Sequence, residues 1–400
     1  MSHLRLALLL GMTVALGPFA LDTYLPAFPR IAADLGVTPG QVGLTLSAYV
    51  AMLGLGQLIG GPLSDRYGRR YILLGGLAIF GFASVMVSVA QALPEVLVWR
   101  VVQAFGGACC AVSVPAIVRD RSHGSEAARL FSLIGLIMFA APALAPSIGS
   151  VILTLADWRA IFVFLAGYAV VVAAMLHVGL FHGAPPASRA RTPVRTLVTN
   201  YALVFRHAAA MRFIAMQALA FSIMLIFITH ASFIYQEWAG LSKTAFSILF
   251  AANIAGMAGA NLLNRRLLRQ FEPPQILRAA IGVQAVTVVI LAIASAFDPP
   301  IAVVAGLIIL AVACMGAIAP NSIACALEYF PRLGGTAAAV LGATQFTFAG
   351  IVSAASTLMA NGTLLAVTLW MAACSLAALF LALPAPGIWR QTRAVAEAET

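Results

Sequence analysis

Twelve long apolar runs, separated by short loops, constrain the fold of this chain more than any other feature of its sequence. Each run is close to or above the length of about 20 residues that a helix needs to cross a bilayer. Only 9% of the 400 residues are charged, against about 25% in a typical soluble domain. We therefore expect an all-α polytopic membrane protein with twelve transmembrane helices. The predicted spans are residues 5–27, 41–63, 71–92, 94–118, 127–154, 158–181, 210–235, 243–264, 275–296, 299–325, 334–360 and 362–384.

The basic residues indicate how the spans are oriented. With the N-terminus inside, 19 of the 23 basic residues fall in inner loops and tails, whereas Arg30, Arg159 and Lys243 fall in outer loops. Cytoplasmic loops carry an excess of Lys and Arg, so both termini are predicted to be cytoplasmic. Because the net charge of +10 resides in these loops, it does not indicate a nucleic-acid partner.

The longest loop, residues 182–209, divides the chain into two halves of six spans. It contains three prolines and four arginines and shows no apolar periodicity, so it is predicted to be a cytoplasmic linker. The expected units are a bundle at 1–181, this linker, a bundle at 210–384 and a cytoplasmic tail at 385–400. A shift of 199 residues aligns Asn264–Arg269 with Asp65–Arg70, which indicates a degenerate internal repeat. Transporters with two such repeats bind their substrate near the midplane, between the halves.

The hairpin between the second and third runs reads Gly61-Pro-Leu-Ser-Asp65-Arg66-Tyr-Gly68-Arg69-Arg70. Its charges place it at the water boundary, because charges in hydrocarbon are expensive. The pattern Gly-x-x-x-Asp-Arg-x-Gly-Arg-Arg resembles the loop signature of the major facilitator superfamily. The resemblance implies two pseudo-symmetric six-helix bundles and a conformational latch that holds them together on the inner side. The implied latch residues are Gly61, Asp65, Arg66, Gly68, Arg69 and Arg70.

Two charges lie inside predicted spans. Asp22 falls in the outer half of the first span, and Arg100 lies about 9 Å below the outer surface in the fourth, from the rise per residue. Burial favours the protonated form of a carboxyl group, whereas a nearby arginine favours the ionised form. We therefore predict that Asp22 and Arg100 couple proton binding to movement. Two alternatives stay open: a solvated Asp22 at the outer rim, and a structural Arg100 bonded to backbone.

Two further motifs carry the resemblance. Leu97-x-x-Arg100-x-x-Gln103-x-x-Gly106 resembles the family's fourth-helix motif, and Ala141–Gly149 resembles a Pro-rich form of its antiporter motif in the fifth helix. Pro142 and Pro146 are expected to bend that helix, and Gly149 permits close helix approach; a generic kinked helix is the alternative. With Asp22–Pro29, these motifs resemble drug:proton antiporters of the Bcr/CflA type.

Polar and aromatic residues inside the spans are predicted to line an amphipathic substrate cavity. The alternative for each polar residue is ordinary hydrogen bonding between helices. Asp157 and Arg159 are expected to pair with each other in an outer loop. The predicted cavity residues are Phe19, Tyr24, Tyr49, Met52, Gln57, His230, Asn253 and Gln345.

The resemblance implies a monomeric, proton-coupled antiporter that exports small amphipathic drugs by alternating access across the bacterial inner membrane, and so contributes to antibiotic resistance. The expected partners are a small-molecule substrate and the lipid bilayer. No nucleophile–base pair, Walker loop or metal-ligand set is evident, so we expect no enzyme activity and no cofactor, with protons as the coupling ion. Proton-coupled export or import of a specific endogenous metabolite stays open, and a non-transporting membrane sensor is a further alternative.

Overall fold

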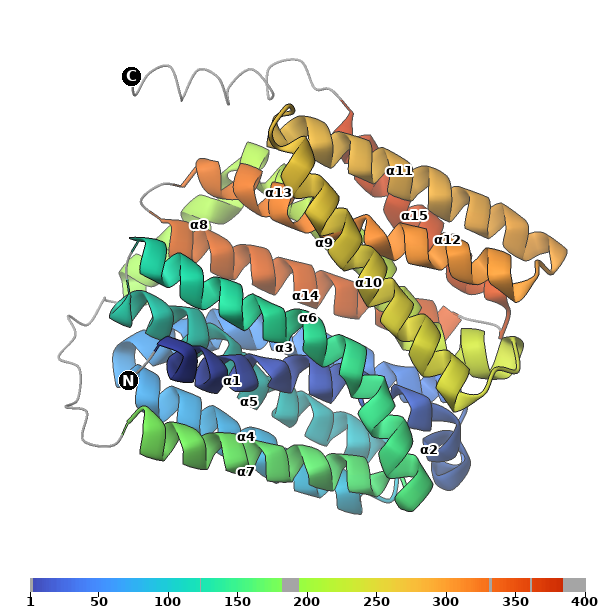
Figure 1. The fold of residues 1–400 in the computed structure, drawn as a ribbon, viewed down its shortest axis with the longest axis horizontal. Helices are drawn as coiled ribbons and strands as arrows, with labels where there is room; N and C mark the ends of the chain where they lie inside the picture. The colour runs from blue at the N-terminus through green and yellow to red at the C-terminus, as the bar shows by residue number, and fades with distance from the viewer. Residues whose placement is uncertain (1–2, 123, 182–193, 331–332, 360–361, 384–400) are drawn as a thin grey trace.

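The computed structural model describes residues 3–122, 124–181, 194–330, 333–359 and 362–383. Within these ranges, twelve helical segments are long and apolar enough to cross a membrane, which confirms the predicted number. Most of the long helices run in a similar direction across the molecule, and the helix Lys243–Leu267 crosses them obliquely (Figure 1). The described part of the chain contains no β-strand, and the all-α fold class is therefore confirmed.

The helices of the first half and of the second half follow in chain order. The first half contains α1 (His3–Asp22), η1 (Leu25–Ala27), α2 (Phe28–Leu35), α3 (Pro39–Tyr67), α4 (Arg69–Val89), α5 (Leu93–Arg121), α6 (Gly124–Leu155) and α7 (Arg159–Gly179). The second half contains α8 (Val194–Arg206), α9 (Ala208–Ser232), the π-helical η2 (Phe233–Trp238), α10 (Lys243–Leu267), α11 (Pro273–Ala294), η3 (Ser295–Phe297), α12 (Ile301–Ala313), α13 (Met315–Glu328), α14 (Gly334–Met359) and α15 (Leu364–Ala382).

Two predicted segments differ from the structure. The first span does not continue as one helix to residue 27, because α1 ends at Asp22 and a 3-10 turn with Pro26 in its first turn leads into α2. Proline has no backbone N–H to continue a helix, and it is favoured at helix starts. The predicted linker is helical over α8, where Tyr201 and Val204 turn one face toward the bundle. The prediction of no apolar periodicity is wrong for this part of the linker.

The contacts sort the spans into two groups. Helices α1–α7 pack together in the lower part of Figure 1, and α9–α15 pack together in the upper part. The pairs α3–α14 and α6–α10 join the groups. The α3–α14 seam is close because a Cβ at Gly54 would lie 2.6 Å from the Thr347 backbone nitrogen, and one at Gly350 would lie 2.5 Å from the Ala51 nitrogen. Small residues let helix backbones approach in this way.

Hydrogen bonds between the two groups gather toward one end of the molecule. Ser47 donates to Ser353 at 2.9 Å across the α3–α14 seam, and Ser150 lies 3.2 Å from Ser247 between α6 and α10. These residues lie nearer the helix ends that are predicted to be outside, and Thr347, whose Oγ1 donates to the Ala51 carbonyl, lies just beyond the middle. The described part of the chain is therefore joined most firmly at its predicted outer end.

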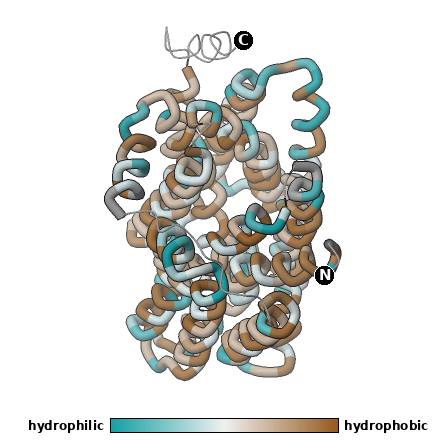
Figure 2. The backbone as a smooth tube through the Cα atoms, turned by 90° about the vertical axis from the view of Figure 1, so that its left-hand side faces the viewer, coloured by the Kyte–Doolittle hydropathy of each residue, from teal (hydrophilic) through white to brown (hydrophobic). Residues whose placement is uncertain are grey.

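The surface of the spans suits a bilayer. Viewed along the helices, hydrophobic colour dominates the spans and hydrophilic colour gathers in the segments that connect them (Figure 2). Large apolar side chains such as Val170, Ile290 and Phe380 are exposed on the sides of the molecule. Exposed apolar surface of this extent is rare on soluble monomers, and lipid is the environment that accepts it.

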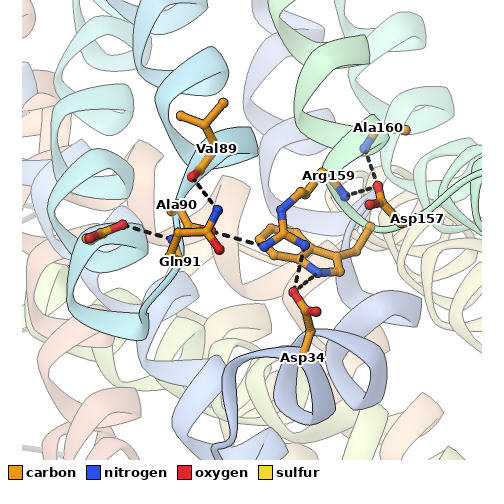
Figure 3. Close-up of polar contacts among 9 residues, drawn as sticks. Asp34, Val89, Ala90, Gln91, Asp157, Arg159 and Ala160 are labelled. Atoms are coloured by element: carbon orange, nitrogen blue, oxygen red, sulfur yellow. Dashed lines mark hydrogen bonds and ion pairs between the residues drawn. The ribbon is translucent and has the colours of Figure 1, made fainter.

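At the predicted outer end, Arg159 connects the start of α7 to the last turn of α2 and to the loop after α4 (Figure 3). Its Nη1 donates to Asp34 at 2.6 Å and its Nη2 donates to the Ala90 carbonyl at 3.2 Å. The expected pairing of Asp157 with Arg159 is wrong, because Asp157 instead accepts from the backbone N–H groups of Arg159 and Ala160 at the start of α7. Aspartate is well suited to such capping because α7 exposes unpaired N–H groups there.

Candidate transport site

Arg100 of α5 is the centre of the candidate site, and its side chain is fully buried. Its Nη1 donates to Gln103 at 2.6 Å, and its Nη2 donates to the Ala20 carbonyl at 3.0 Å and to the Tyr24 hydroxyl at 3.3 Å. Ala20 lies in the last turn of α1, where backbone carbonyls lack a partner within the helix. The break after Asp22 therefore leaves free the backbone oxygen that Arg100 binds.

Aromatic rings surround the Arg100 guanidinium. Its central carbon lies 4.2 Å from the ring centroid of Tyr49, 4.6 Å from that of Tyr24 and 5.8 Å from that of Phe162. Aromatic faces attract a cation, and this attraction offsets part of the cost of burying the charge. Arg100 thus forms the backbone hydrogen bond that was described above as the alternative to a role in proton coupling.

Asp22 is also buried, with 5% of its surface exposed, but it does not contact Arg100. No ion pair or hydrogen bond joins their side chains in the described part of the chain. Arg100 instead binds the Ala20 carbonyl and the Tyr24 hydroxyl, which lie two residues before and two after Asp22. The expected contact between the two side chains is therefore absent from this conformation.

Helix α6 packs against the break in α1 through Gly149. A Cβ at Gly149 would overlap the backbone carbonyl of Thr23, so no side chain fits there. The close approach expected at this glycine is thus present, and its partner is the residue next to Asp22. Pro142 and Pro146 lie within α6, which continues unbroken through both of them.

The predicted latch residues contact one another and their own group of helices. Asp65 pairs with Arg69 at 2.5 Å, and Arg69 also lies 3.4 Å from Asp120 at the end of α5. Gly68 joins α3 to α4 with a φ of 97°, a conformation that glycine adopts readily. Arg66 is exposed. These contacts tie α3, α4 and α5 together within the first group.

Two latch residues, Gly61 and Arg70, lie near residues outside α3, α4 and α5. Arg70 donates to the Phe181 carbonyl just after α7, at 3.4 Å. A Cβ at Gly61 would lie 3.9 Å from the hydroxyl of Tyr201 in α8. Burial, and then the nearby Asp65 carboxylate, raise the pKa of Tyr201. The linker helix thus lies beside the latch loop.

The second repeat has an uncharged counterpart of the Asp65–Arg69–Asp120 contacts. Asn264, which aligns with Asp65, is buried and accepts a hydrogen bond from Asn321 at 2.7 Å. The bond joins α10 to α13, as the Asp65–Arg69–Asp120 contacts join α3 and α4 to α5. The degenerate motif therefore keeps a structural bond without its charges.

The predicted cavity residues of the first half do not all lie together. Tyr24 and Tyr49 belong to the Arg100 cluster, whereas Phe19 packs edge-on against Tyr168 of α7, with ring centroids 5.2 Å apart. Met52 is half-buried on α3. Gln57 is on the α3–α14 seam, since a Cβ at Gly342 would lie 2.7 Å from its side-chain oxygen.

The predicted cavity residues of the second half form hydrogen bonds within that half. His230 Nε2 lies 3.1 Å from Ser356 Oγ, and Asn253 donates to the Leu249 carbonyl of its own helix at 2.8 Å. Gln345 accepts from Gln217 of α9 at 3.1 Å. Gln217 was not predicted as a cavity residue; its only signal in the sequence is an amide within an apolar run.

The described residues contain no group of three His, Cys, Asp or Glu side chains able to hold a metal ion. All five cysteines are buried and free. The chemistry present is a buried carboxyl group, an arginine whose two Nη groups are hydrogen-bonded while its Nε has no partner among the described residues, and neutral amides and hydroxyls. This set can bind a proton and form hydrogen bonds to a solute.

Replacing Tyr24 or Tyr49 with phenylalanine distinguishes the contributions of their two hydroxyl groups to stability. Tyr24→Phe removes the hydroxyl that accepts from Arg100 and lies 3.0 Å from Thr45, with an expected cost of about 1–3 kcal/mol. The Tyr49 hydroxyl is buried without a partner in the described part of the chain, so Tyr49→Phe is expected to leave stability unchanged or raise it slightly. Melting temperatures of the two purified variants in detergent test this, and equal losses would contradict it.

Comparison with known proteins places the chain in context. A family model described as Major Facilitator Superfamily matches residues 9–357. The chain is 28% identical over 367 residues to the bicyclomycin resistance protein homolog of Haemophilus influenzae, with 92% of each protein covered. It is 30% identical over 338 residues to the chloramphenicol resistance protein of Pseudomonas aeruginosa, covering 83% of this chain and 79% of that protein. It is 28% identical over 364 residues to multidrug resistance protein D of Escherichia coli, with 89% of each covered.

Among solved structures, the fold is similar to a partially occluded inward open conformation of the xylose transporter XylE from E. coli. The TM-score is 0.72 at 16% sequence identity, with 95% of this chain and 99% of that chain covered. At this identity the similarity concerns the fold alone.

Proposed function

Because the chain belongs to the Major Facilitator Superfamily, a family of transporters and not of enzymes, we propose that it exports small amphipathic drugs in exchange for protons. Bicyclomycin, chloramphenicol and multidrug resistance proteins are among its relatives at about 30% identity. Their names support a drug-like substrate. If both termini are in the cytoplasm of a bacterium, as predicted, the Asp65 loop is also cytoplasmic. Export then carries the solute away from the side of the membrane on which this loop lies.

The burial of Asp22 carries this proposal. Asp22 alone is buried among the acidic residues that the structure describes; the other ten are exposed. An intramembrane acid away from water is expensive when charged and is a functional candidate for that reason. A carboxyl group that is costly to bury when charged, and that lies at the helix end predicted to be near the outer surface, suits proton uptake from outside.

We propose that the break after α1 couples protonation of Asp22 to the movement of the two groups of helices. The 3-10 turn that follows Asp22 contacts α9 and α10 of the second group. Protonation of Asp22 removes a charge beside this contact, and so changes the free energy of opening the groups at their outer end. Arg100 keeps its bonds to Ala20 and Tyr24 and acts as a positioning residue that holds the break open.

The contacts between the groups support an inward-facing conformation. Ser47–Ser353 and Ser150–Ser247 hold the predicted outer end closed, while Asp65 pairs locally with Arg69 at the predicted inner end. In the proposed cycle, the outer bonds break and the latch engages when the site opens outward. A potential of 100 mV contributes about 2.3 kcal/mol per charge moved, which corresponds to accumulation of some tens of fold.

Flux measurements on the wild-type protein in proteoliposomes test the proposal. Vesicles with an acidic interior are expected to accumulate radiolabelled chloramphenicol from the medium, because protons leaving the vesicle drive the solute inward. A protonophore should abolish the accumulation. Accumulation that persists without a proton gradient, or that requires an alkaline interior, would rule out proton antiport.

A further inference from the structure

We propose that Gln57 of α3, Gln217 of α9 and Gln345 of α14 form a carboxamide site at the middle of the membrane that selects uncharged, hydrogen-bonding substrates. This inference rests on the proposed export function and assigns the class of molecule carried. The three side chains come from both groups of helices, so a molecule bound to them contacts the surfaces that move relative to each other.

The three glutamines lie at one depth. Gln217 is nine residues from the first residue of α9, Gln345 is eleven from the first residue of α14, and Gln57 is ten from the last residue of α3. At 1.5 Å per residue, these positions are about 14 to 17 Å from helix ends on the same side. Because the hydrocarbon core is about 30 Å thick, all three lie near the midplane.

Contacts bring the amides toward one place. Gln217 donates to Gln345 at 3.1 Å. Gly342 precedes Gln345 by three residues, so the two are neighbours on the surface of α14. Gln57 projects into the space that a side chain at Gly342 would fill. The glycine thus admits an amide from the first group beside the amide pair of the second.

The glutamines retain unused hydrogen-bonding groups. Gln217 is 1% exposed, and its side-chain oxygen has no partner among the described residues. Leaving such an oxygen unpaired costs about 1–3 kcal/mol, so a partner is expected. Gln57 forms no side-chain hydrogen bond in the described part of the chain, and Gln345 uses only its oxygen. The site therefore offers both acceptors and donors to a ligand.

The surroundings of these amides are aromatic and uncharged. Phe221 and Phe346 meet edge to face with ring centroids 5.2 Å apart, one turn from Gln217 and next to Gln345. Flat apolar groups pack well against such rings. No charged residue occurs in 213–236 or 334–359, so a cation would find no counter-ion on α9 or α14. The site thus favours neutral molecules that carry N–H, O–H or carbonyl groups beside an apolar ring.

Binding measurements on the full-length protein in lipid nanodiscs, without any gradient, test this site. The probes are radiolabelled chloramphenicol, which is uncharged with an amide N–H, two hydroxyls and an aromatic ring, and tetraphenylphosphonium, an aromatic cation without donors. The wild-type protein is expected to bind chloramphenicol more tightly. Gln217→Leu and Gln345→Leu should each weaken chloramphenicol binding by about tenfold or more, the equivalent of one lost hydrogen bond, and leave tetraphenylphosphonium binding unchanged.

Gln284 supplies a matched control. It is also 1% exposed, donates to the Ala311 carbonyl at 3.0 Å and has an unpaired oxygen, but it lies between α11 and α12. Gln284→Leu should therefore leave chloramphenicol affinity unchanged. If Gln217→Leu does not fold, Gln57→Met on the half-buried seam takes its place.

Any one of three results would overturn the site. The first is the absence of saturable chloramphenicol binding by the wild-type protein. The second is wild-type chloramphenicol affinity in both the Gln345→Leu variant and the Gln217→Leu (or Gln57→Met) variant, and the third is an equal loss of affinity in Gln284→Leu. The proposed function fails separately, through the absence of proton-driven flux in proteoliposomes. Because binding is measured without a gradient, the two failures are distinguishable.

Discussion

An Asp22→Asn variant is expected to lose proton-driven export completely while it keeps its fold and its affinity for substrate. Asparagine has nearly the shape of aspartate but cannot take up or release a proton at physiological pH. The bonds that hold the break in α1 run from Arg100 to Ala20 and Tyr24 and do not involve the Asp22 carboxyl group. The substitution therefore removes the proposed proton site and leaves the Arg100 cluster intact.

Proteoliposome flux under an imposed pH gradient measures this loss. Wild-type uptake of chloramphenicol should rise with the gradient, whereas uptake by Asp22→Asn should not respond to it. Asp298→Asn is a suitable control, because Asp298 is exposed and has a φ of 44°, a conformation that asparagine tolerates. Undiminished coupling in the Asp22 variant would exclude this residue from the mechanism, even if the protein proved to be an exporter.

A Gly149→Val variant is expected to suffer the largest loss of folded protein. The added side chain would overlap the Thr23 backbone carbonyl, and a backbone atom cannot move aside as the tip of a flexible side chain can. Overpacking of this kind costs about 1–3 kcal/mol or more. Relief of the overlap requires α6 to move away from the break in α1, and with it the contact next to Asp22.

Gly135→Val in the same helix isolates the overlap. A Cβ at Gly135 would meet nothing within 4 Å, and the intrinsic helix propensity changes equally at both positions. The yield of monodisperse protein and its melting temperature should fall for Gly149→Val and stay near the wild-type values for Gly135→Val. Equal behaviour of the two variants would show that α6 does not need to lie against Thr23.

Sequence alone predicted those features that depend on the free-energy cost of placing a given residue in hydrocarbon. Charges and unpaired backbone groups are expensive in hydrocarbon, so twelve apolar runs, and the loops that carry the arginines, followed from composition along the chain. Gly149 was identified in the same way, since a glycine in a proline-rich membrane helix signals close packing. The sequence also predicts the depth of Asp22 and Arg100 in the membrane, because each lies a known number of residues from a helix end.

Only the tertiary structure decided which groups touch. Asp22 and Arg100 are predicted to lie at similar depth, but Arg100 binds the Ala20 carbonyl and the Tyr24 hydroxyl and not the Asp22 carboxyl group. The direction of a side chain depends on helix phase and on how neighbouring helices are rotated, and no single span encodes either. The meeting of Gln57 with Gly342 and Gln345 has the same origin, because it joins residues nearly three hundred positions apart through the packing of two bundles.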